Sequence, residues 1–359
     1  MRWMKFDRMA PGGGVEVSCR LENGKAFLEW EFSIVESAGE QTAGYMGESR
    51  EGLYIRLILT NMREETALEG MRLVREEEPL QSILLQPFLW RGPSEPYLYH
   101  MEAILADREG NCLDRVSRPL PLRSVGCMDI QGKRQLLLNG SAFEPRAVSY
   151  ILPAGGTAVS RQYQMTEDLR WICGMGANSV CVEADSQGIP GSFRQLCDRL
   201  GLLLFFRKEG EEGWVWIQDR EGKFRIQCGE TIPSFRGGRD CLFPDGNGAP
   251  ASLYYYYRAK WSREPFVYIV PESIMRMDSG NFTVKCYSNC DRVALYSDGN
   301  LFEFQRGETE FVFREVPAGK PSVMLTAEGD GCSESLAVHK SFLERKRREA
   351  DGALILYGI

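Results

Sequence analysis

A strand–helix alternation that starts in the middle of the chain and stops early constrains the fold most. A helix from Thr166 is followed by a strand at 179–183, a second helix at 192–200 and another strand at 202–206. This alternation predicts parallel β/α units. A charged turn at 207–213 then ends the pattern. The chain therefore begins a parallel β/α domain and does not continue it.

The first helix has its own boundary signals. Thr166 is predicted as the N-cap, with Glu167 and Asp168 in the first turn, where acidic side chains suit the helix dipole. Gly174 and Gly176 are predicted to end the helix. Glycines after a helix, rather than after a strand, also fail the context of a dinucleotide-binding loop.

Length sets the size of this domain. A closed eight-stranded β/α barrel typically needs about 250 residues, and the stretch 127–252 offers about half of that length. We therefore predict a β/α domain over 126–262 that is too short to close such a barrel.

The flanking regions carry short apolar runs separated by turn residues. Such strands predict a β-sandwich over 1–125 and a second, C-terminal β-sandwich over 263–341. The tail 342–359 mixes basic and acidic residues and is interpreted as a solvated short helix. The predicted fold class is thus multidomain, β plus α/β.

Several motifs occur in a fixed order along the chain. They are Leu-Leu-Leu-Asn-Gly at 136–140, Glu-Pro-Arg-Ala-Val-Ser at 144–149, Gly-Ala-Asn-Ser-Val at 176–180, Leu-Cys-Asp-Arg-Leu-Gly at 196–201, Gly-Trp-Val-Trp at 213–216 and Tyr-Tyr-Tyr-Tyr-Arg-Ala-Lys-Trp-Ser at 254–262. In this order they resemble glycoside hydrolase family 2, which includes β-galactosidases and β-glucuronidases.

Two further stretches extend the resemblance into the sandwiches. The segment 88–99 resembles the signature of the immunoglobulin-like domain before the family's barrel, and 287–296 resembles a strand pair of the sandwich that follows it. The jelly-roll domain that usually comes first has no room here. The resemblance implies that both sandwiches, 1–125 and 263–341, are immunoglobulin-like and that 126–262 is a truncated (β/α) barrel domain. It also implies that 214–217 is the eighth and last barrel strand.

The resemblance implies a glycosidase site that this sequence lacks. Retaining glycosidases use two carboxyl groups about 5–5.5 Å apart, and in the family these are glutamates that end the fourth and seventh strands. Only the turn 207–213 separates the third-strand and eighth-strand candidates, so strands four to seven are predicted to be absent. No catalytic residue is assigned.

Some residues remain as candidates for a rebuilt site. Glu183 and Asp185 lie near the end of the second strand, and Asp219 lies just past the last one. The alternative is that they are ordinary polar loop-facing residues. Trp214 and Trp216 are candidates for stacking on a sugar.

The aromatic run 254–257 is interpreted as packing between domains, with sugar stacking as its alternative.

Composition excludes several classes of partner. A net charge of −7 favours neither nucleic acid nor an anionic membrane. The N-terminus has no apolar signal region, so a cytoplasmic protein is expected. The 11 cysteines are expected to be reduced, mostly buried thiols. Cys286 and Cys290 are close together but have no second close pair, so no metal and no cofactor are expected.

Three functional hypotheses remain. The leading one is a degenerate family 2 protein of carbohydrate metabolism, a pseudoenzyme that binds a carbohydrate or a protein partner, as a homo-oligomer or docked on a related protein. The second is an active glycosidase, β-galactosidase-like, with a rebuilt or interface-completed site. The third is a non-functional remnant of an internally deleted gene. Whether the chain is an enzyme stays open at this stage.

Overall fold

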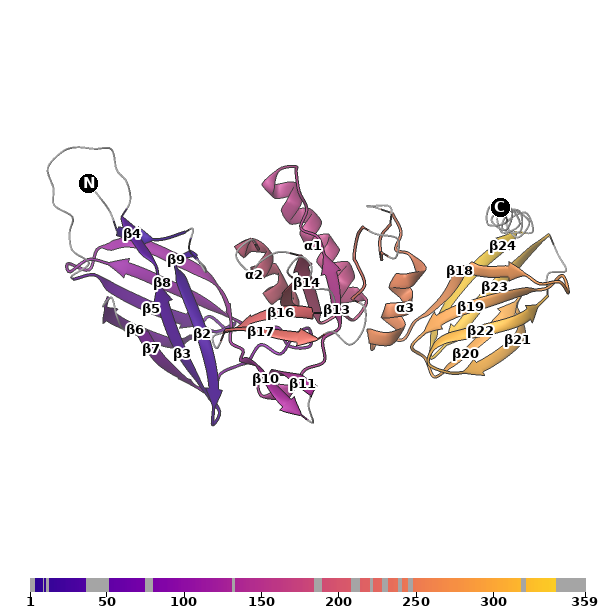
Figure 1. The fold of residues 1–359 in the computed structure, drawn as a ribbon, viewed down its shortest axis with the longest axis horizontal. Helices are drawn as coiled ribbons and strands as arrows, with labels where there is room; N and C mark the ends of the chain where they lie inside the picture. Colours follow the sequence, from indigo (N-terminus) through magenta and orange to yellow (C-terminus); the bar gives the residue numbers. More distant parts are fainter. Residues whose placement is uncertain are drawn as a thin grey trace. The chain divides into compact units, whose positions relative to one another are not determined.

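In the computed structural model the chain forms two compact units, and each is described by itself (Figure 1). The first unit comprises Met1–Arg170 and Asn178–Ile232, and the second comprises Trp171–Ala177 and Pro233–Ile359. The structure describes residues 4–8, 10, 13–36, 52–74, 80–130, 133–183, 189–207, 214–219, 222–227, 232–237, 241–244, 248–317 and 321–339. The predicted tail 342–359 lies outside these residues.

A β-sandwich opens the first unit. One sheet has the order β2-β3-β7 and the other has the order β6-β5-β8-β9, and β1 pairs with β4. The strands are β1 (Met4–Phe6), β2 (Val15–Glu22), β3 (Lys25–Phe32), β4 (Ile34–Glu36), β5 (Tyr54–Thr60), β6 (Thr66–Leu73), β7 (Leu80–Leu85), β8 (Leu98–Ala106) and β9 (Cys112–Pro121). All the pairings are antiparallel.

Alternating side chains explain the sandwich core. In β5, Ile55, Leu57 and Leu59 are buried while the residues between them face outward. A period of two places one face of each strand in the core. Trp30 on β3 is fully buried, and its indole N–H donates to Ser82 Oγ at 2.8 Å. The predicted sandwich strands therefore form as the pattern indicates.

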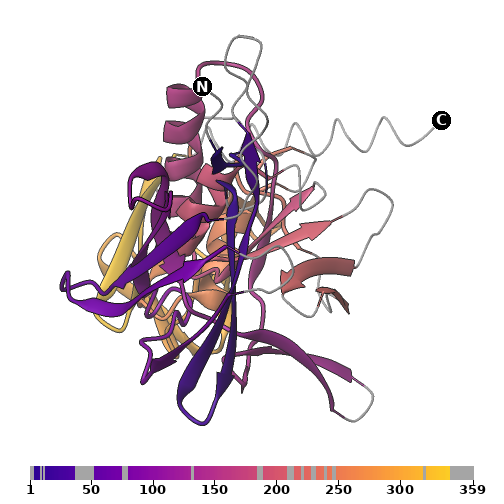
Figure 2. The ribbon, with the colours of Figure 1, turned by 90° about the vertical axis from the view of Figure 1, so that its left-hand side faces the viewer.

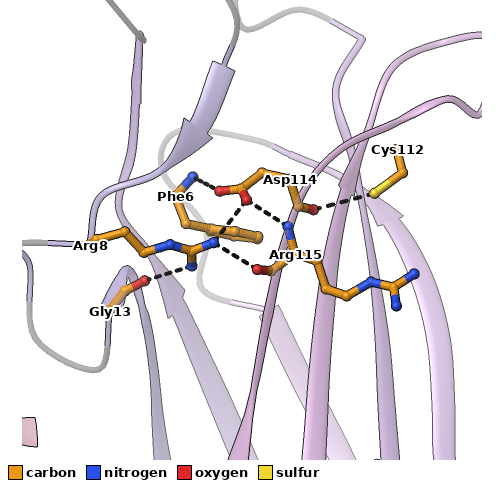
Figure 3. Close-up of polar contacts among 6 residues, drawn as sticks. All are labelled: Phe6, Arg8, Gly13, Cys112, Asp114 and Arg115. Carbon is orange, nitrogen blue, oxygen red and sulfur yellow. Dashed lines mark hydrogen bonds and ion pairs between the residues drawn. The ribbon is translucent and has the colours of Figure 1, made fainter.

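The side chain of Asp114 on β9 joins this sandwich to the short strand β1 (Figure 3). Its carboxylate accepts hydrogen bonds from the backbone N–H of Phe6 at 2.8 Å and from Arg8 Nη2 at 2.8 Å. Arg8 Nη2 also donates to the carbonyl of Arg115 at 2.7 Å. Phe6 is fully buried beneath this network, so the charged contacts hold the start of the described chain against β9.

A small three-stranded antiparallel sheet links the sandwich to the central sheet. It consists of β10 (Val125–Ile130), β11 (Lys133–Leu138) and β12 (Ser141–Ala142). Asn139 and Gly140, with φ of 53° and 77°, form the turn between β11 and β12. Two consecutive positive φ angles are the requirement of a tight hairpin turn, and Asn-Gly meets it with least strain. This turn belongs to the motif at 136–140.

The central sheet of the first unit has the order β13-β14-β15-β16-β17. Its strands are β13 (Ala147–Tyr150), β14 (Ser179–Glu183), β15 (Leu203–Arg207), β16 (Trp214–Asp219) and β17 (Gly222–Gln227). The first three are parallel and are joined by α1 (Ala158–Gly174) and α2 (Gly191–Leu200). Over the residues described, β13 and β17 stand at the two edges, so the sheet is open.

Both faces of this sheet carry other elements of the same unit. The helix α1 stands on one side and the β10–β11 hairpin on the other (Figures 1 and 2). On the hairpin side, apolar residues of β10 and β11 share one core cluster with residues of β14, β15 and β16. That cluster contains Trp90, Val125, Leu136, Leu138, Cys181, Leu203, Phe205, Val215 and Ile217. The hairpin thus helps to bury the sheet face that lies away from the helices.

The second unit contains α3 (Ser252–Trp261) and a C-terminal β-sandwich. The sandwich sheets have the orders β18-β19-β22 and β21-β20-β23-β24. The strands are β18 (Val267–Arg276), β19 (Phe282–Ser288), β20 (Arg292–Ser297), β21 (Asn300–Arg306), β22 (Thr309–Val316), β23 (Ser322–Gly329) and β24 (Cys332–His339). Phe282, Phe311 and Phe313 are fully buried between the sheets.

Two predictions about the central domain are wrong. The first helix begins at Ala158, so Thr166 lies inside it rather than at its N-cap, and Thr166 Oγ1 donates to the carbonyl of Gln162 at 2.8 Å. The segment 214–217 is not a last parallel barrel strand, because β16 pairs antiparallel with β15. The end of α2 is confirmed, since Gly201 adopts the left-handed conformation that closes the helix.

Candidate functional site

Three polar residues lie at the carboxyl ends of the parallel strands of the central sheet. Tyr150 ends β13, Glu183 ends β14 and Arg207 ends β15. Glu183 and Arg207 are register partners, whereas Tyr150 is the partner of Val182. Side chains alternate along a strand, so Glu183 and Arg207 share one face of the sheet and Tyr150 lies on the other, all three at the strand ends where β/α proteins place their functional groups.

Glu183 and Arg207 form an ion pair at this edge. Glu183 is the register partner of Arg207, and Arg207 Nη1 lies 3.9 Å from Glu183 Oε1. The side chain of Glu183 is 57% exposed and that of Arg207 is 21% exposed. Such an exposed pair contributes less than about 1 kcal/mol to stability. Its importance is chemical, because the charged neighbour of this carboxylate is a cation.

Tyr150 is buried and packs against the helices rather than facing solvent. It is 1% exposed, its hydroxyl donates to Asp168 Oδ2 at 2.9 Å, and its ring stacks on Phe193 of α2 with a centroid distance of 5.5 Å. Asp168 is itself only 2% exposed. A buried carboxylate needs such hydrogen bonds to offset its lost hydration. Tyr150 and Asp168 therefore anchor α1 and α2 at the strand end.

The other candidates for a rebuilt site fall where the structure gives no side chain. Asp185 lies outside the described residues. Trp214, Trp216 and Asp219 belong to β16, but their side chains also lie outside what the structure describes. The structure thus places Glu183 beside Arg207. A catalytic role for Glu183, Asp185 or Asp219 and a sugar-binding role for Trp214 or Trp216 stay predictions.

Two carboxyl groups of the sandwiches have a raised pKa. Burial raises the pKa of Glu16 on β2, and repulsion from Glu31 adds to it. Burial also raises the pKa of Glu334 on β24. A raised carboxyl pKa can mark a general acid. Here Glu16 lies among Glu31, Arg118 and Arg194, and Glu334 accepts the backbone N–H of Ile269, so each group has partners within the protein.

The aromatic run 254–257 packs on the C-terminal sandwich. Tyr255 stacks on Tyr268 of β18 with ring centroids 3.6 Å apart and an interplanar angle of 7°. Tyr256 contacts Tyr287 of β19 edge to face at 5.4 Å. Ser252 Oγ donates to Glu272 Oε2 at 2.5 Å at the start of the same helix. The run therefore packs α3 on the sandwich within the second unit, and its predicted role in packing between domains stays a prediction.

The described cysteines do not form a metal centre. Across those residues, no three His, Cys, Asp or Glu side chains gather so as to hold a metal ion. Burial raises the pKa of Cys286 to about 12, so this thiol stays protonated in the sandwich core. Of the helices that the structure describes, none is long and apolar enough to cross a membrane.

The residue pattern does not reveal the partners of two acids, Glu183 at the end of β14 and Asp168 within α1. Arg207 was assigned to a charged turn, although it closes β15 and meets Glu183. Asp168 was read as a first-turn acid, although it lies in the middle of α1 and binds Tyr150. The signal available for Arg207 was its position at the end of an apolar strand next to one that ends in an acid.

No protein-family model and no curated protein matches the chain. Solved structures do match. One is an FMN-binding β-glucuronidase from Facaelibacterium prausnitzii L2-6, with a TM-score of 0.67 and 14% identity over 94% of this chain and 75% of that chain.

Two further structures show the same likeness. A putative β-galactosidase from Bacteroides fragilis gives a TM-score of 0.69 at 14% identity, covering 93% of this chain and 74% of that one. A β-glucuronidase from Bacteroides uniformis gives 0.68 at 14% identity, and the alignment covers 94% of this chain but only 62% of the enzyme. Identities this low establish the fold alone. The chain has the fold of β-glucuronidases and β-galactosidases of the glycoside hydrolase family 2 type, with an open sheet in place of the closed barrel.

Proposed function

We propose that this chain is a degenerate, carbohydrate-related protein of the glycoside hydrolase family 2 type that does not cleave glycosidic bonds. It acts by binding a carbohydrate or a protein partner. The observation that carries the proposal is the direct antiparallel pairing of β15 with β16, in which Phe206 is the partner of Trp216. Only residues 208–213 separate these strands in the sequence, and among the described strands of the sheet none lies between them.

The chemistry of glycoside hydrolysis supports this reading. A retaining enzyme needs two carboxyl groups about 5–5.5 Å apart, and an inverting enzyme needs them about 6.5–9.5 Å apart. Both arrangements use the carboxyl ends of several strands of a closed barrel. Here Glu183 faces Arg207 at 3.9 Å, and the strands that would carry the second carboxyl group are replaced by an antiparallel hairpin.

The fold and the two tryptophans of β16 support a carbohydrate as the ligand. The structural neighbours include β-glucuronidases and a putative β-galactosidase, and β16 carries Trp214 and Trp216 at its start and centre. Indole rings stack on the apolar faces of sugar rings and bury a large area. We therefore propose a neutral or acidic oligosaccharide as the small-molecule ligand.

A protein partner is the other form of the same proposal. The faces of the central sheet are covered by α1 and by the β10–β11 hairpin. Among the described strands, β13 and β17 stand at the two edges of this sheet and each has a neighbouring strand on one side only. Unpaired strand edges are a template for pairing with another chain. Self-association, or docking on a related protein, would cover these edges.

Titration with soluble oligosaccharides tests the proposed binding. Isothermal titration with β-linked galactosides and glucuronides is expected to give saturable heat with the wild-type chain and weaker binding with Trp216→Ala. Tyr163→Ala is a matched control, because Tyr163 is 70% exposed on α1 and lies on no part of β16. Equal binding by both variants would contradict the role of Trp216. No binding by the wild type, together with a monodisperse monomer in light scattering, would contradict the proposal.

Rebuilt catalysis remains the second candidate because Glu183 is an exposed carboxylate at a parallel strand end. A second carboxyl group from Asp185, Asp219 or another copy of the chain would complete the pair. Turnover of aryl glycosides that disappears in Glu183→Gln would establish it.

A further inference from the structure

Two thiols of the C-terminal sandwich lie next to each other. Cys290 sits in the connection between β19 and β20, and Cys332 is the first residue of β24. Their Sγ atoms are 3.8 Å apart, although the residues are 42 positions apart in the sequence. Cys290 is 2% exposed and Cys332 is half-buried. The fold of the second unit therefore places one inaccessible and one accessible thiol in van der Waals contact.

The surroundings hold both thiols in this arrangement. The Cys332 thiol donates to the carbonyl of Gly329 at 2.7 Å. A Cβ atom at position 329 would lie 3.0 Å from Cys290 Cβ and 3.1 Å from Cys290 Sγ. Such distances are tighter than most real Cβ contacts, so a side chain at position 329 would press on Cys290 and the glycine leaves room for it. The backbone N–H of Cys290 donates to Ser288 Oγ at 3.0 Å, which fixes the connection that carries it.

We propose that Cys290 and Cys332 are a redox modification site, which closes to a disulfide by exchange with a low-molecular-weight disulfide such as oxidised glutathione. A disulfide has an S–S bond of about 2.05 Å. The two sulfur atoms therefore need to approach by less than about 2 Å to form the bond. None of the other functional hypotheses for this chain depends on this pair.

The exchange proceeds in two balanced steps. The thiolate of Cys332, the more accessible residue, attacks the S–S bond of oxidised glutathione, forms a mixed disulfide and releases one glutathione thiolate. The thiolate of Cys290 then attacks the Cys332 sulfur and releases the second glutathione. The protein loses two electrons and glutathione gains them, and the two protein thiol protons end on the released glutathione thiols. Burial raises the pKa of Cys290 to about 11, so the second step is expected to accelerate as the pH rises.

The crosslink would act on the last strand of the sandwich. Cys332 starts β24, which is the edge strand of its sheet and pairs only with β23 among the described strands. Cys290 belongs to the connection that joins the two sheets. A disulfide that closes a long loop removes conformations from the unfolded chain. Oxidation is therefore expected to hold β24 in place and to stabilise the second unit.

Mass spectrometry of the full chain tests the proposal directly. The reduced protein is equilibrated with oxidised glutathione, blocked and digested with trypsin without reductant. Cys290 falls in peptide 286–292, which also contains Cys286, and Cys332 falls in peptide 315–340. The expected product is these two peptides joined, in an intact protein that has lost two hydrogen masses. The melting temperature is expected to rise by several degrees and to return after reduction.

Substitution distinguishes the two cysteines of the first peptide. Cys286→Ser should keep the crosslink, while Cys290→Ser and Cys332→Ser should abolish both the crosslink and the shift in melting temperature. Cys332→Ser serves even if the buried Cys290→Ser variant does not fold. A crosslink through Cys286, or a stable mixed disulfide of Cys332 with glutathione and no crosslink, would overturn the proposal.

Discussion

Glu183 and Arg207 end neighbouring parallel strands of the central sheet, and Arg207 Nη1 lies 3.9 Å from Glu183 Oε1. In a glycosidase of this fold, the edge where they stand would carry the reacting carboxyl groups. Here the charged neighbour of the strand-end glutamate is a guanidinium. After Arg207 the chain turns back antiparallel as β16, instead of adding another β/α unit. This pair therefore stands where the parallel β/α pattern ends.

The contact between α2 and the first sandwich makes Gly201 a sensitive position. Gly201 has φ of 77°, and a Cβ there would lie 2.5 Å from backbone atoms of Gly92 and Pro93. Gly140 has the same φ but no atom within 4 Å of its Cβ position. Gly140→Ala should cost about 1–2 kcal/mol for the left-handed conformation alone, and Gly201→Ala should cost clearly more. Urea denaturation measures both, and equal costs would contradict the close contact.

The network around Asp114 predicts a local effect at the start of the described chain. Asp114→Ala removes the acceptor of the Phe6 N–H and the partner of Arg8. Leaving a largely buried donor unpaired costs about 1–3 kcal/mol. Hydrogen exchange of the Phe6 amide should accelerate while exchange in the C-terminal sandwich stays unchanged. An unchanged Phe6 amide would show that Asp114 does not hold β1.

The stacked pair of Tyr255 and Tyr268 predicts how α3 is attached to its sandwich. Tyr255→Ala removes a parallel stack with ring centroids 3.6 Å apart, and such pairs contribute about 0.5–1.5 kcal/mol beyond their buried area. The free energy of unfolding of the second unit should fall by at least this amount. Tyr163→Ala, at an exposed position of α1, should leave it unchanged. Equal effects of the two substitutions would contradict the packing role.

Glu334 predicts a pH dependence with a definite sign. Burial raises its pKa in the folded protein above the usual 4.5, so the folded state binds more protons than the unfolded state in the interval between the two values. Stability contributed by this group is present below pH 4.5 and is lost as the pH rises through the raised pKa. Glu334→Gln keeps an acceptor for the Ile269 N–H and removes this titration. Urea midpoints from pH 4 to 8 should therefore decline less in the variant, and parallel profiles would contradict this prediction.

Local signals allowed much of the fold to be predicted from the sequence. The helix 192–200 and the strand 179–183 match α2 and β14 closely, because Gly201 and the apolar runs mark their ends. The start of α1 was missed because Val159 and Tyr163 in its first turns are exposed, so no apolar periodicity reveals them. Thr166 resembles an N-cap, but its hydroxyl is satisfied by the carbonyl of Gln162 inside the helix.

The site was less predictable because it depends on strand pairing. The order of motifs predicted the glycosidase-like fold, which the solved structures confirm. The sequence alone did not show that β16 runs antiparallel, since both directions share one apolar pattern. The Glu183–Arg207 contact follows from the register of two strands separated by α2, which residue types along the chain do not reveal.

The most direct test of the central claim is hydrolysis of aryl β-galactosides, β-glucuronides, β-mannosides and β-glucosides by the purified chain, with a cooperative melt as proof of folding. Glu183→Gln, Asp185→Asn and Asp219→Asn serve as controls. We expect no turnover above background for the wild type or any variant. Turnover by the wild type that disappears in one of these variants would contradict it and would show that a catalytic pair has been rebuilt on the open sheet.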